Sequence, residues 1–140
     1  MAAQPKILIV DDEERFRTTM CKLLTVRGLE AVTAGSGPEA IEMLRKNPYD
    51  VVILDVRMPE MGGVEVLSEI KRIDPRAEII IMTGYASVDT AKEIMKLGAY
   101  DYVLKPYAIE ELMEKIEGAF DRKISRIRLT GGAATESQKP

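Results

Sequence analysis

The chain has 140 residues, of which 46% are hydrophobic and 31% charged, and its formal net charge is −3. This balance is typical of one globular domain with a hydrophobic core, and the length is too short for two ordinary domains. Both signs of charge are spread along the chain, which argues against a nucleic-acid partner, because phosphate backbones recruit dense basic patches. The chain has no histidine, which excludes histidine-based catalytic triads and metal sites with histidine ligands. Any phosphohistidine must therefore come from another protein.

The apolar runs are too short to cross a membrane, since none approaches the roughly 20 residues that a bilayer requires. The run Ile7 to Val10 near the N-terminus is also too short for a signal peptide. The one cysteine, Cys21, has no partner for an internal disulfide, which is compatible with a reducing compartment. We therefore expect a cytoplasmic protein with no membrane partner.

Short apolar runs alternate with amphipathic segments along the chain. The runs are residues 7–10, 31–34, 51–54, 79–82 and 102–104. Three of them are continuously apolar and rich in β-branched residues, as parallel strands covered on both faces are. Apolar residues recur at helical spacing in five further segments, which are residues 13–27, 36–44, 64–70, 87–97 and 109–120.

Start and stop signals bound several of the expected helices. Gly28 and Gly98 are expected to end the first and the fourth, because glycine readily adopts the left-handed conformation of a C-terminal cap. Ser36 and Glu39 form a capping-box pattern at the start of the second, and Ser87 can cap the fourth. Successive strand–helix units predict a parallel sheet with helices on both sides, since parallel strands need crossover connections.

Polar side chains follow four of the expected strands. Asp11 and Asp12 follow the first, Asp55 the third, Thr83 the fourth and Lys105 the fifth. Ligands of open α/β sheets bind at the carboxyl ends of the strands, so we expect these side chains to share one edge. Each alone could be ordinary loop polarity, and Asp12 could be a carboxylate that stabilises a helix N-terminus. Together they indicate a site.

Three carboxylates at one edge favour a bound cation, because like charges close together disfavour ionisation. Oxygen-only ligands favour Mg²⁺. Lys105 adds a positive charge for a carboxylate or phosphoryl oxygen, and Thr83 adds a hydroxyl donor. Such parts suit phosphoryl transfer, which depends on positioning and charge neutralisation. Asp55, alone after the middle strand, is the best candidate for the nucleophile.

Four segments carry a resemblance to a known family, and they are Ile7–Asp12, Asp55–Gly63, Met82–Tyr85 and Asp101–Pro106. In these segments the chain resembles the receiver domains of bacterial response regulators, over about residues 5–122. The resemblance implies a single doubly wound (βα)5 domain of the flavodoxin-like α/β class, with strand order 2-1-3-4-5. Residues 6–122 would form this domain, and residues 1–5 an N-terminal tail.

The resemblance also implies a function for the acidic residues. Asp55 would accept a phosphoryl group from the phosphohistidine of a sensor histidine kinase or a phosphotransfer protein. Asp12, Asp55 and the backbone carbonyl of Arg57 would bind Mg²⁺, and Asp11 would act through water. The chain would then be a phosphoacceptor that catalyses only its own phosphorylation and dephosphorylation, and not an enzyme.

The remaining site residues are expected to sense the phosphoryl group. Thr83 and Lys105 would contact its oxygens, and the peptide bond before Pro106 is expected to be cis. Tyr102 resembles the switch aromatic of the family, and it can at the same time be a strand aromatic packed on its neighbour. The output surface would be the fourth helix, fifth strand and fifth helix, through which a homodimer could form. Phosphorylation would shift a pre-existing equilibrium.

Arg57 and Tyr85 are expected to tune the lifetime of the phosphoryl group. Each lies two residues after a site residue, and the bulk of Tyr85 is expected to slow attack by water. Two alternatives stay open. A Mg²⁺-dependent aspartyl-phosphate phosphatase would carry an acid where Arg57 stands, and an unphosphorylated interaction module would not need the acid set.

Helical spacing continues beyond the expected end of the fifth helix, in a stripe formed by Met113, Ile116, Phe120, Ile124 and Ile127. Residues 123–129 would extend this helix with a solvated face, contact a second copy or lead to an output domain. Residues 130–140 are expected to form a flexible tail. A stand-alone regulator and the receiver of a longer protein both fit, and the stretch Met82 to Ser87 weakly favours a transcription regulator.

Overall fold

The computed structural model describes residues 4–56, 62–84 and 88–132, so the expected cap at Ser87 lies outside the described residues. Five strands alternate with five α-helices in this part of the chain, and a short π-helical segment follows them. The elements are β1 (Lys6–Val10), α1 (Glu14–Val26), β2 (Glu30–Ala34), α2 (Gly37–Lys46), β3 (Val51–Asp55), α3 (Gly63–Ile73), β4 (Glu78–Thr83), α4 (Val88–Met95), β5 (Asp101–Leu104), α5 (Ile109–Arg126) and η2 (Ile127–Gly132).

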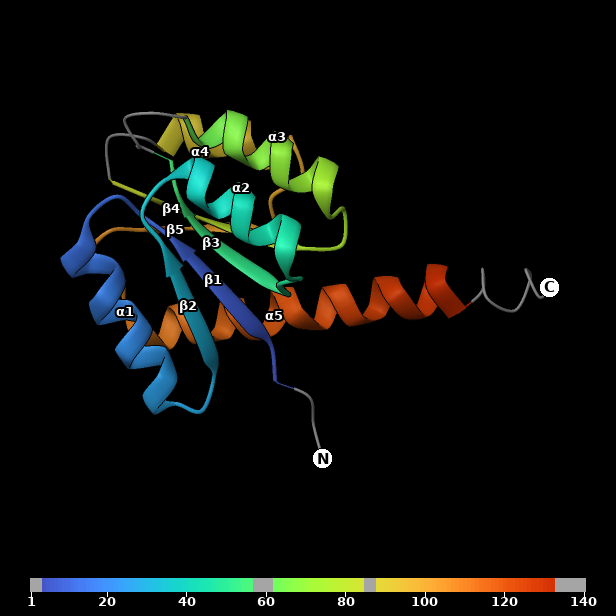
Figure 1. Cartoon of the computed structure of the whole chain (residues 1–140), viewed down its shortest axis with the longest axis horizontal. Coiled ribbons are helices and arrows are strands. Elements are labelled where there is room, and N and C mark those ends of the chain that lie inside the picture. The colour runs from blue at the N-terminus through green and yellow to red at the C-terminus, as the bar shows by residue number, and fades with distance from the viewer. Residues whose placement is uncertain (1–3, 57–61, 85–87, 133–140) are drawn as a thin grey trace.

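The strands form one parallel sheet in the order β2-β1-β3-β4-β5, which confirms the predicted doubly wound fold. Figure 1 shows α2, α3 and α4 on one face of the sheet and α1 and α5 on the other. Each face has its own hydrophobic core. In β1, Leu8 and Val10 face the first core and Ile7 and Ile9 the second, because successive side chains of a strand point to opposite faces. This alternation explains the continuous apolar run.

The helix ends follow the predicted signals with two differences. Gly28 and Gly98 have φ angles of 88° and 114°, which glycine adopts without steric cost. The N–H of Glu39 donates to Ser36 Oγ at 3.2 Å, but Glu39 Oε1 accepts from the N–H of Gly35 at 2.7 Å. The fourth helix ends at Met95 and not at Leu97, because residues 96–98 close a tighter turn with i to i−3 hydrogen bonds.

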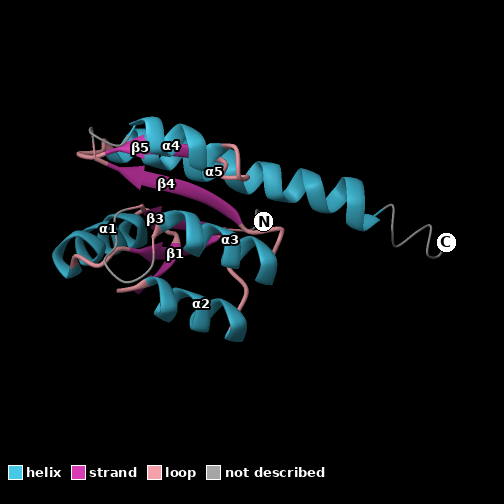
Figure 2. Cartoon of the chain, turned by 90° about the horizontal axis from the view of Figure 1, so that it is seen from above, coloured by secondary structure: helices cyan, strands magenta, loops and turns pink. Residues whose placement is uncertain are grey.

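Basic residues near the end of α5 are joined to the sheet edge opposite the strand carboxyl ends. Glu78 is fully buried and accepts from Arg122 Nε at 2.9 Å and from Arg126 Nη1 at 3.0 Å. Lys123 Nζ donates to Asp50 Oδ1 at 2.6 Å. No local sequence pattern indicates these pairs, because their members are distant along the chain. They fix α5 as it runs past the sheet (Figure 2).

A glycine inside α5 allows a tyrosine to approach the helix closely. A Cβ atom added at Gly118 would overlap the Tyr100 hydroxyl oxygen and lie 3.1 Å from Tyr100 Cζ. Alanine gains about 1 kcal/mol over glycine inside a helix, whereas overpacking costs about 1–3 kcal/mol. We expect Gly118→Ala to lower the free energy of unfolding in spite of the gain in helix propensity.

Urea unfolding of Gly118→Ala measures this effect, and the same substitution in a Tyr100→Phe background is the control. Removal of the hydroxyl takes away the overlapping atom, so the loss of stability should shrink there. A Gly118→Ala variant that is more stable than the wild type would contradict the steric argument.

Candidate functional site

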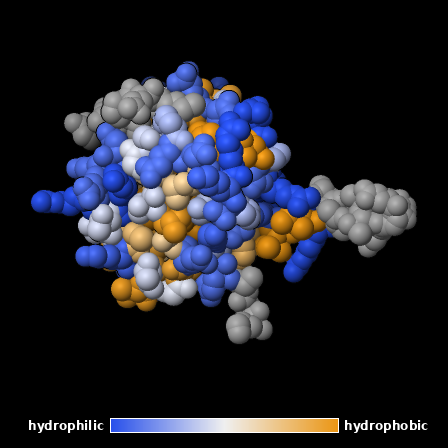
Figure 3. All heavy atoms as spheres, in the orientation of Figure 1, coloured by the Kyte–Doolittle hydropathy of each residue, from blue (hydrophilic) through white to orange (hydrophobic). Residues whose placement is uncertain are grey.

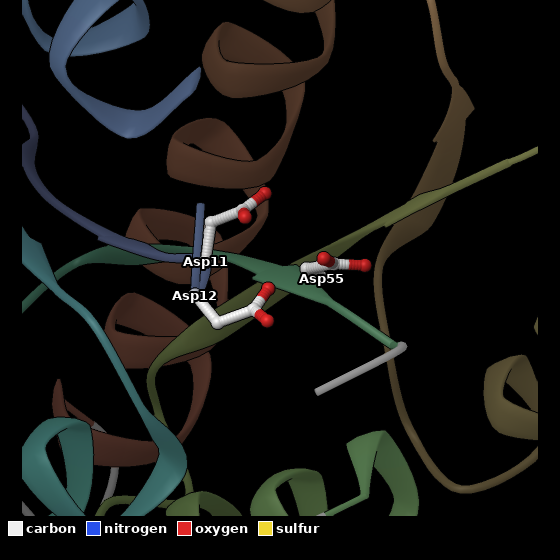
Figure 4. Close-up of side chains that lie close together, drawn as sticks. All are labelled: Asp11, Asp12 and Asp55. Carbon is white, nitrogen blue, oxygen red and sulfur yellow. The ribbon is translucent and has the colours of Figure 1, made fainter. Parts of the chain in front are cut away.

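Three carboxylates meet at the carboxyl edge of the sheet, as the sequence predicted. Asp11 and Asp12 directly follow β1, and Asp55 ends the neighbouring β3. One carboxylate oxygen from each lies within 4.8 Å of those of the other two, and Figure 4 shows the three side chains at this edge. Asp11 and Asp55 are 2% and 7% exposed, whereas Asp12 is exposed. The cluster therefore concentrates negative charge in a partly buried place.

Lys105 reaches this cluster from the end of β5. Its Nζ donates to Asp11 Oδ2 at 3.0 Å and lies 3.5 Å from Asp55 Oδ2. The Lys105 side chain is 24% exposed, so water only partly screens these contacts. One ammonium does not balance three carboxylates, and the excess negative charge favours a cation.

The backbone around Asp11 is held by several hydrogen bonds. Asp11 Oδ1 accepts from the N–H of Glu13 at 2.9 Å. The Asp11 N–H donates to Ala34 O at 3.1 Å, and Arg17 Nη1 donates to Asp11 O at 3.1 Å. These contacts tie the β1–α1 loop to β2 and to α1. The position of the acidic pair is thus set by backbone geometry as well as by Lys105.

Thr83 ends β4 at the same edge and is fully buried. Its hydroxyl donates to Gly84 O at 3.2 Å, and its carbonyl accepts from the N–H of Lys105 at 2.7 Å. The ends of β4 and β5 are therefore joined directly beside the acids. A cleft of about 450 Å³ opens here, lined by Asp12, Glu13, Asp55, Gly84 and Lys105.

Two further predicted positions lie on or after β5. The peptide bond between Lys105 and Pro106 is cis. Tyr102 is partly buried and packs against the core on the α4 side of the sheet. Arg57 and Tyr85, the two positions expected to tune lifetime, lie outside the described residues.

Phe16 is not among the predicted site residues. It lies in the amphipathic segment of residues 13–27, and its ring centroid is 4.1 Å from Lys105 Nζ. The helical period indicates which face of α1 is apolar and says nothing of which distant side chain that face meets. The sequence signal that could have pointed to Phe16 as a site residue is its place, an aromatic residue four positions after Asp12.

Comparisons with known proteins agree with this geometry. Residues 7–117 match the family model described as the response regulator receiver domain. The chain is 35% identical over 112 residues to sporulation initiation phosphotransferase F of Bacillus subtilis, covering 80% of this chain and 90% of that protein. A crystal structure of a response regulator receiver domain protein from Clostridium thermocellum superposes with a TM-score of 0.81 and 39% identity, covering 85% and 96% of the two chains.

The chain belongs to the response regulator receiver domain family. It is accordingly a phosphoacceptor signalling module rather than a true enzyme, and the acidic triad is typical of the metal site of such domains. It is also 41% identical over 112 residues to the regulatory protein AtoC of Escherichia coli, which covers 80% of this chain and only 24% of AtoC. The chain thus spans about a quarter of the first curated relatives that it matches.

Within the part of the chain that the structure describes, no helix is both long enough and apolar enough to cross a membrane.

Proposed function

We propose that Asp55 accepts a phosphoryl group and that the chain signals through the resulting change of conformation. The observation that carries this proposal is the meeting of three carboxylates and Lys105 in one cleft. The donor would be a phosphohistidine of a histidine kinase or a phosphotransfer protein in the cytoplasm. A carboxylate oxygen of Asp55 forms a bond to phosphorus as the P–N bond breaks, and the electron pair of that bond returns to the imidazole.

The lining of the cleft, which includes Asp55, favours Asp55 over Asp11 as the acceptor. Asp11 accepts from the Glu13 N–H at 2.9 Å through one oxygen and from Lys105 at 3.0 Å through the other. The contact between Asp55 and Lys105 is longer, at 3.5 Å, and Asp55 lines the open cleft. A phosphoryl donor can therefore approach Asp55 without breaking the bonds that position Asp11.

The acidic cluster fits Mg²⁺ by its donor chemistry. Its ligand atoms are all oxygens, they lie within 4.8 Å of one another, and their charge exceeds that of Lys105. Asp12 and Asp55 would hold the ion, with Asp11 acting through water and the carbonyl of Arg57 as a further ligand. Bound there, Mg²⁺ would neutralise charge on the phosphoryl oxygens.

Thr83 and Lys105 would register the new phosphoryl group, which adds about −1.5 to −2 charges and strong acceptor oxygens. The Lys105 ammonium would give up its contact with Asp55 and donate a hydrogen bond to a phosphoryl oxygen instead. The Thr83 hydroxyl would leave the Gly84 carbonyl for another such oxygen, and the segment after β4 would follow. Tyr102 would change rotamer with it. Arg57 and Tyr85 would border the path of attacking water, and Tyr85 would slow dephosphorylation.

The face formed by α4, β5 and α5 would carry the signal outward. Leu97, in the turn after α4, and Leu104, at the end of β5, are 49% and 40% exposed, and a second copy or an output domain that docks here would bury them. Figure 3 shows hydrophobic side chains on the projecting end that the last part of α5 forms with η2, and Leu129 of η2 is 75% exposed. Residues 123–129 would continue the helix or link it to an output domain, as the partial coverage of AtoC suggests.

Acetyl phosphate with Mg²⁺ tests the acceptor by intact mass. We expect the wild type to gain the mass of one phosphoryl group and Asp55→Asn to gain none. Asp121→Asn, which changes an exposed carboxylate on α5, should gain as much as the wild type. An unmodified wild type, or an Asp55→Asn variant modified to the same extent, would refute the proposal.

A further inference from the structure

An aromatic ring contacts Lys105 in addition to the carboxylates. Phe16, in the first turn of α1, places its ring centroid 4.1 Å from Lys105 Nζ. Tyr107, two residues after Lys105, meets the Phe16 ring in a T-shaped contact with centroids 5.7 Å apart and planes at 75°. Both aromatic residues are partly buried against the core between α1, α5 and the sheet. The lysine therefore lies between its acidic partners and a ring whose orientation is fixed by packing.

The face of an aromatic ring attracts a cation electrostatically, and the attraction grows as the pair is withdrawn from water. The Lys105 side chain is 24% exposed, so the pair of ammonium and ring is partly withdrawn from solvent here. A ring face favours an ammonium above it without dictating which oxygen receives its protons. A hydrogen bond donated by the ammonium to a polar residue would impose such a direction.

We propose that Phe16 is a positioning residue for phosphoryl transfer. Its ring holds the ammonium of Lys105, which sits on a flexible four-carbon chain, over the acidic cleft. From this place the ammonium can pass from Asp55 to a phosphoryl oxygen while its distance from the ring stays the same. This inference rests on the proposed function of Asp55, and it adds a residue that acts through Lys105.

The competing interpretation is that Phe16 only fills space in the core. Fluorination of the ring distinguishes an electrostatic role of Phe16 from a packing role, because fluorine withdraws electron density from the ring face with little change in ring size. Mono-, di- and trifluorophenylalanine would be incorporated at position 16 of the otherwise unchanged chain. The rate of phosphorylation by acetyl phosphate would be measured by intact mass. In this reaction an Asp55 oxygen bonds to phosphorus, and acetate leaves with the electron pair of the broken P–O bond.

We expect the rate to fall stepwise with each fluorine, by about 2- to 5-fold in total, from the usual strength of such contacts. Phe120 provides a matched control, since it is the other phenylalanine of the chain and packs against the same core. The fluorinated series at Phe120 should leave the rate unchanged.

A second measurement needs neither Mg²⁺ nor phosphorylation. In NMR spectra the methylene protons next to Lys105 Nζ should show an upfield ring-current shift. Phe16→Leu should abolish this shift and Phe16→Tyr should keep it. Absence of the shift in the wild type would overturn the contact itself.

The outcomes separate the two proposals. Equal rates across the series at position 16, with Asp55→Asn still inactive, overturn the role of Phe16 and leave Asp55 as the acceptor. A wild type that is never phosphorylated overturns the function of Asp55 and with it the role of Phe16.

Discussion

Arg122→Met is expected to lower the free energy of unfolding by roughly 3 kcal/mol, the usual effect of removing one partner from a buried ion pair. Glu78 is fully buried and takes two hydrogen bonds from Arg122 and one from Arg126. The hydrogen bond with Glu78 raises the pKa of Arg122 and so stabilises its charged guanidinium. Without Arg122, the carboxylate loses two hydrogen bonds in a place that water does not reach, and its contact with Arg126 remains.

Glu78→Met, which removes the buried partner, should lower the free energy of unfolding by less than Arg122→Met does. Arg122 and Arg126 are 35% and 46% exposed, so both guanidinium groups can turn to water when Glu78→Met removes their partner. The double variant Glu78→Met/Arg122→Met is therefore expected to be more stable than Arg122→Met alone, because it no longer buries a poorly compensated charge.

Chemical unfolding of these variants gives the comparison, and Arg72→Met supplies a matched control. Arg72 Nη2 lies 2.6 Å from Glu69 Oε1, a distance similar to that of the shortest contact between Arg122 and Glu78, but this pair lies on the helix surface. Its removal should have no measurable effect, since exposed ion pairs contribute little. If Arg72→Met lowered the free energy of unfolding as much as Arg122→Met does, burial would not determine how much an ion pair contributes to stability.

Asp12→Asn is expected to weaken Mg²⁺ binding at least about tenfold, because it removes one of three negative charges close to the ion. In the absence of Mg²⁺ the same change should leave stability unchanged or raise it, by up to about 1 kcal/mol, since it relieves repulsion at an exposed position. The two opposite signs have one cause, which is the crowding of the three carboxylates within 4.8 Å.

Calorimetric Mg²⁺ titration and thermal unfolding with and without Mg²⁺ measure both parts. Bound Mg²⁺ stabilises the folded state by mass action, so the variant should lose most of the rise in Tm that the wild type shows. Glu14→Gln is the control, because it removes an exposed charge in the first turn of α1 outside the cluster. An unchanged Mg²⁺ affinity in Asp12→Asn would exclude that carboxylate from the site.

Much of the fold could be predicted because its signals are local. The apolar runs report burial on both faces of the strands, and Gly28 and Gly98 mark chain turns that require positive φ. The acids and Lys105 could be grouped because the carboxyl ends of parallel strands share one edge. Family resemblance then supplied the strand order, which the structure confirms.

Other features depend on which elements meet in space. Glu78 precedes an apolar run and would pass for an ordinary loop acid, yet it is buried because Arg122, 44 positions away, reaches it. The need for glycine at position 118 likewise depends on packing, because the Tyr100 hydroxyl occupies the space that a Cβ atom would fill there.

The sequence by itself determined the alternation of strands and helices and the residues that lie at the carboxyl edge, since periodicity and strand direction are properties of each segment. Only the tertiary structure decided that Lys105 rests on the ring of Phe16 while it donates to Asp11. The physical reason is that contacts across the sheet depend on how α1 and α5 pack on a common face, and no single segment of the sequence carries that information.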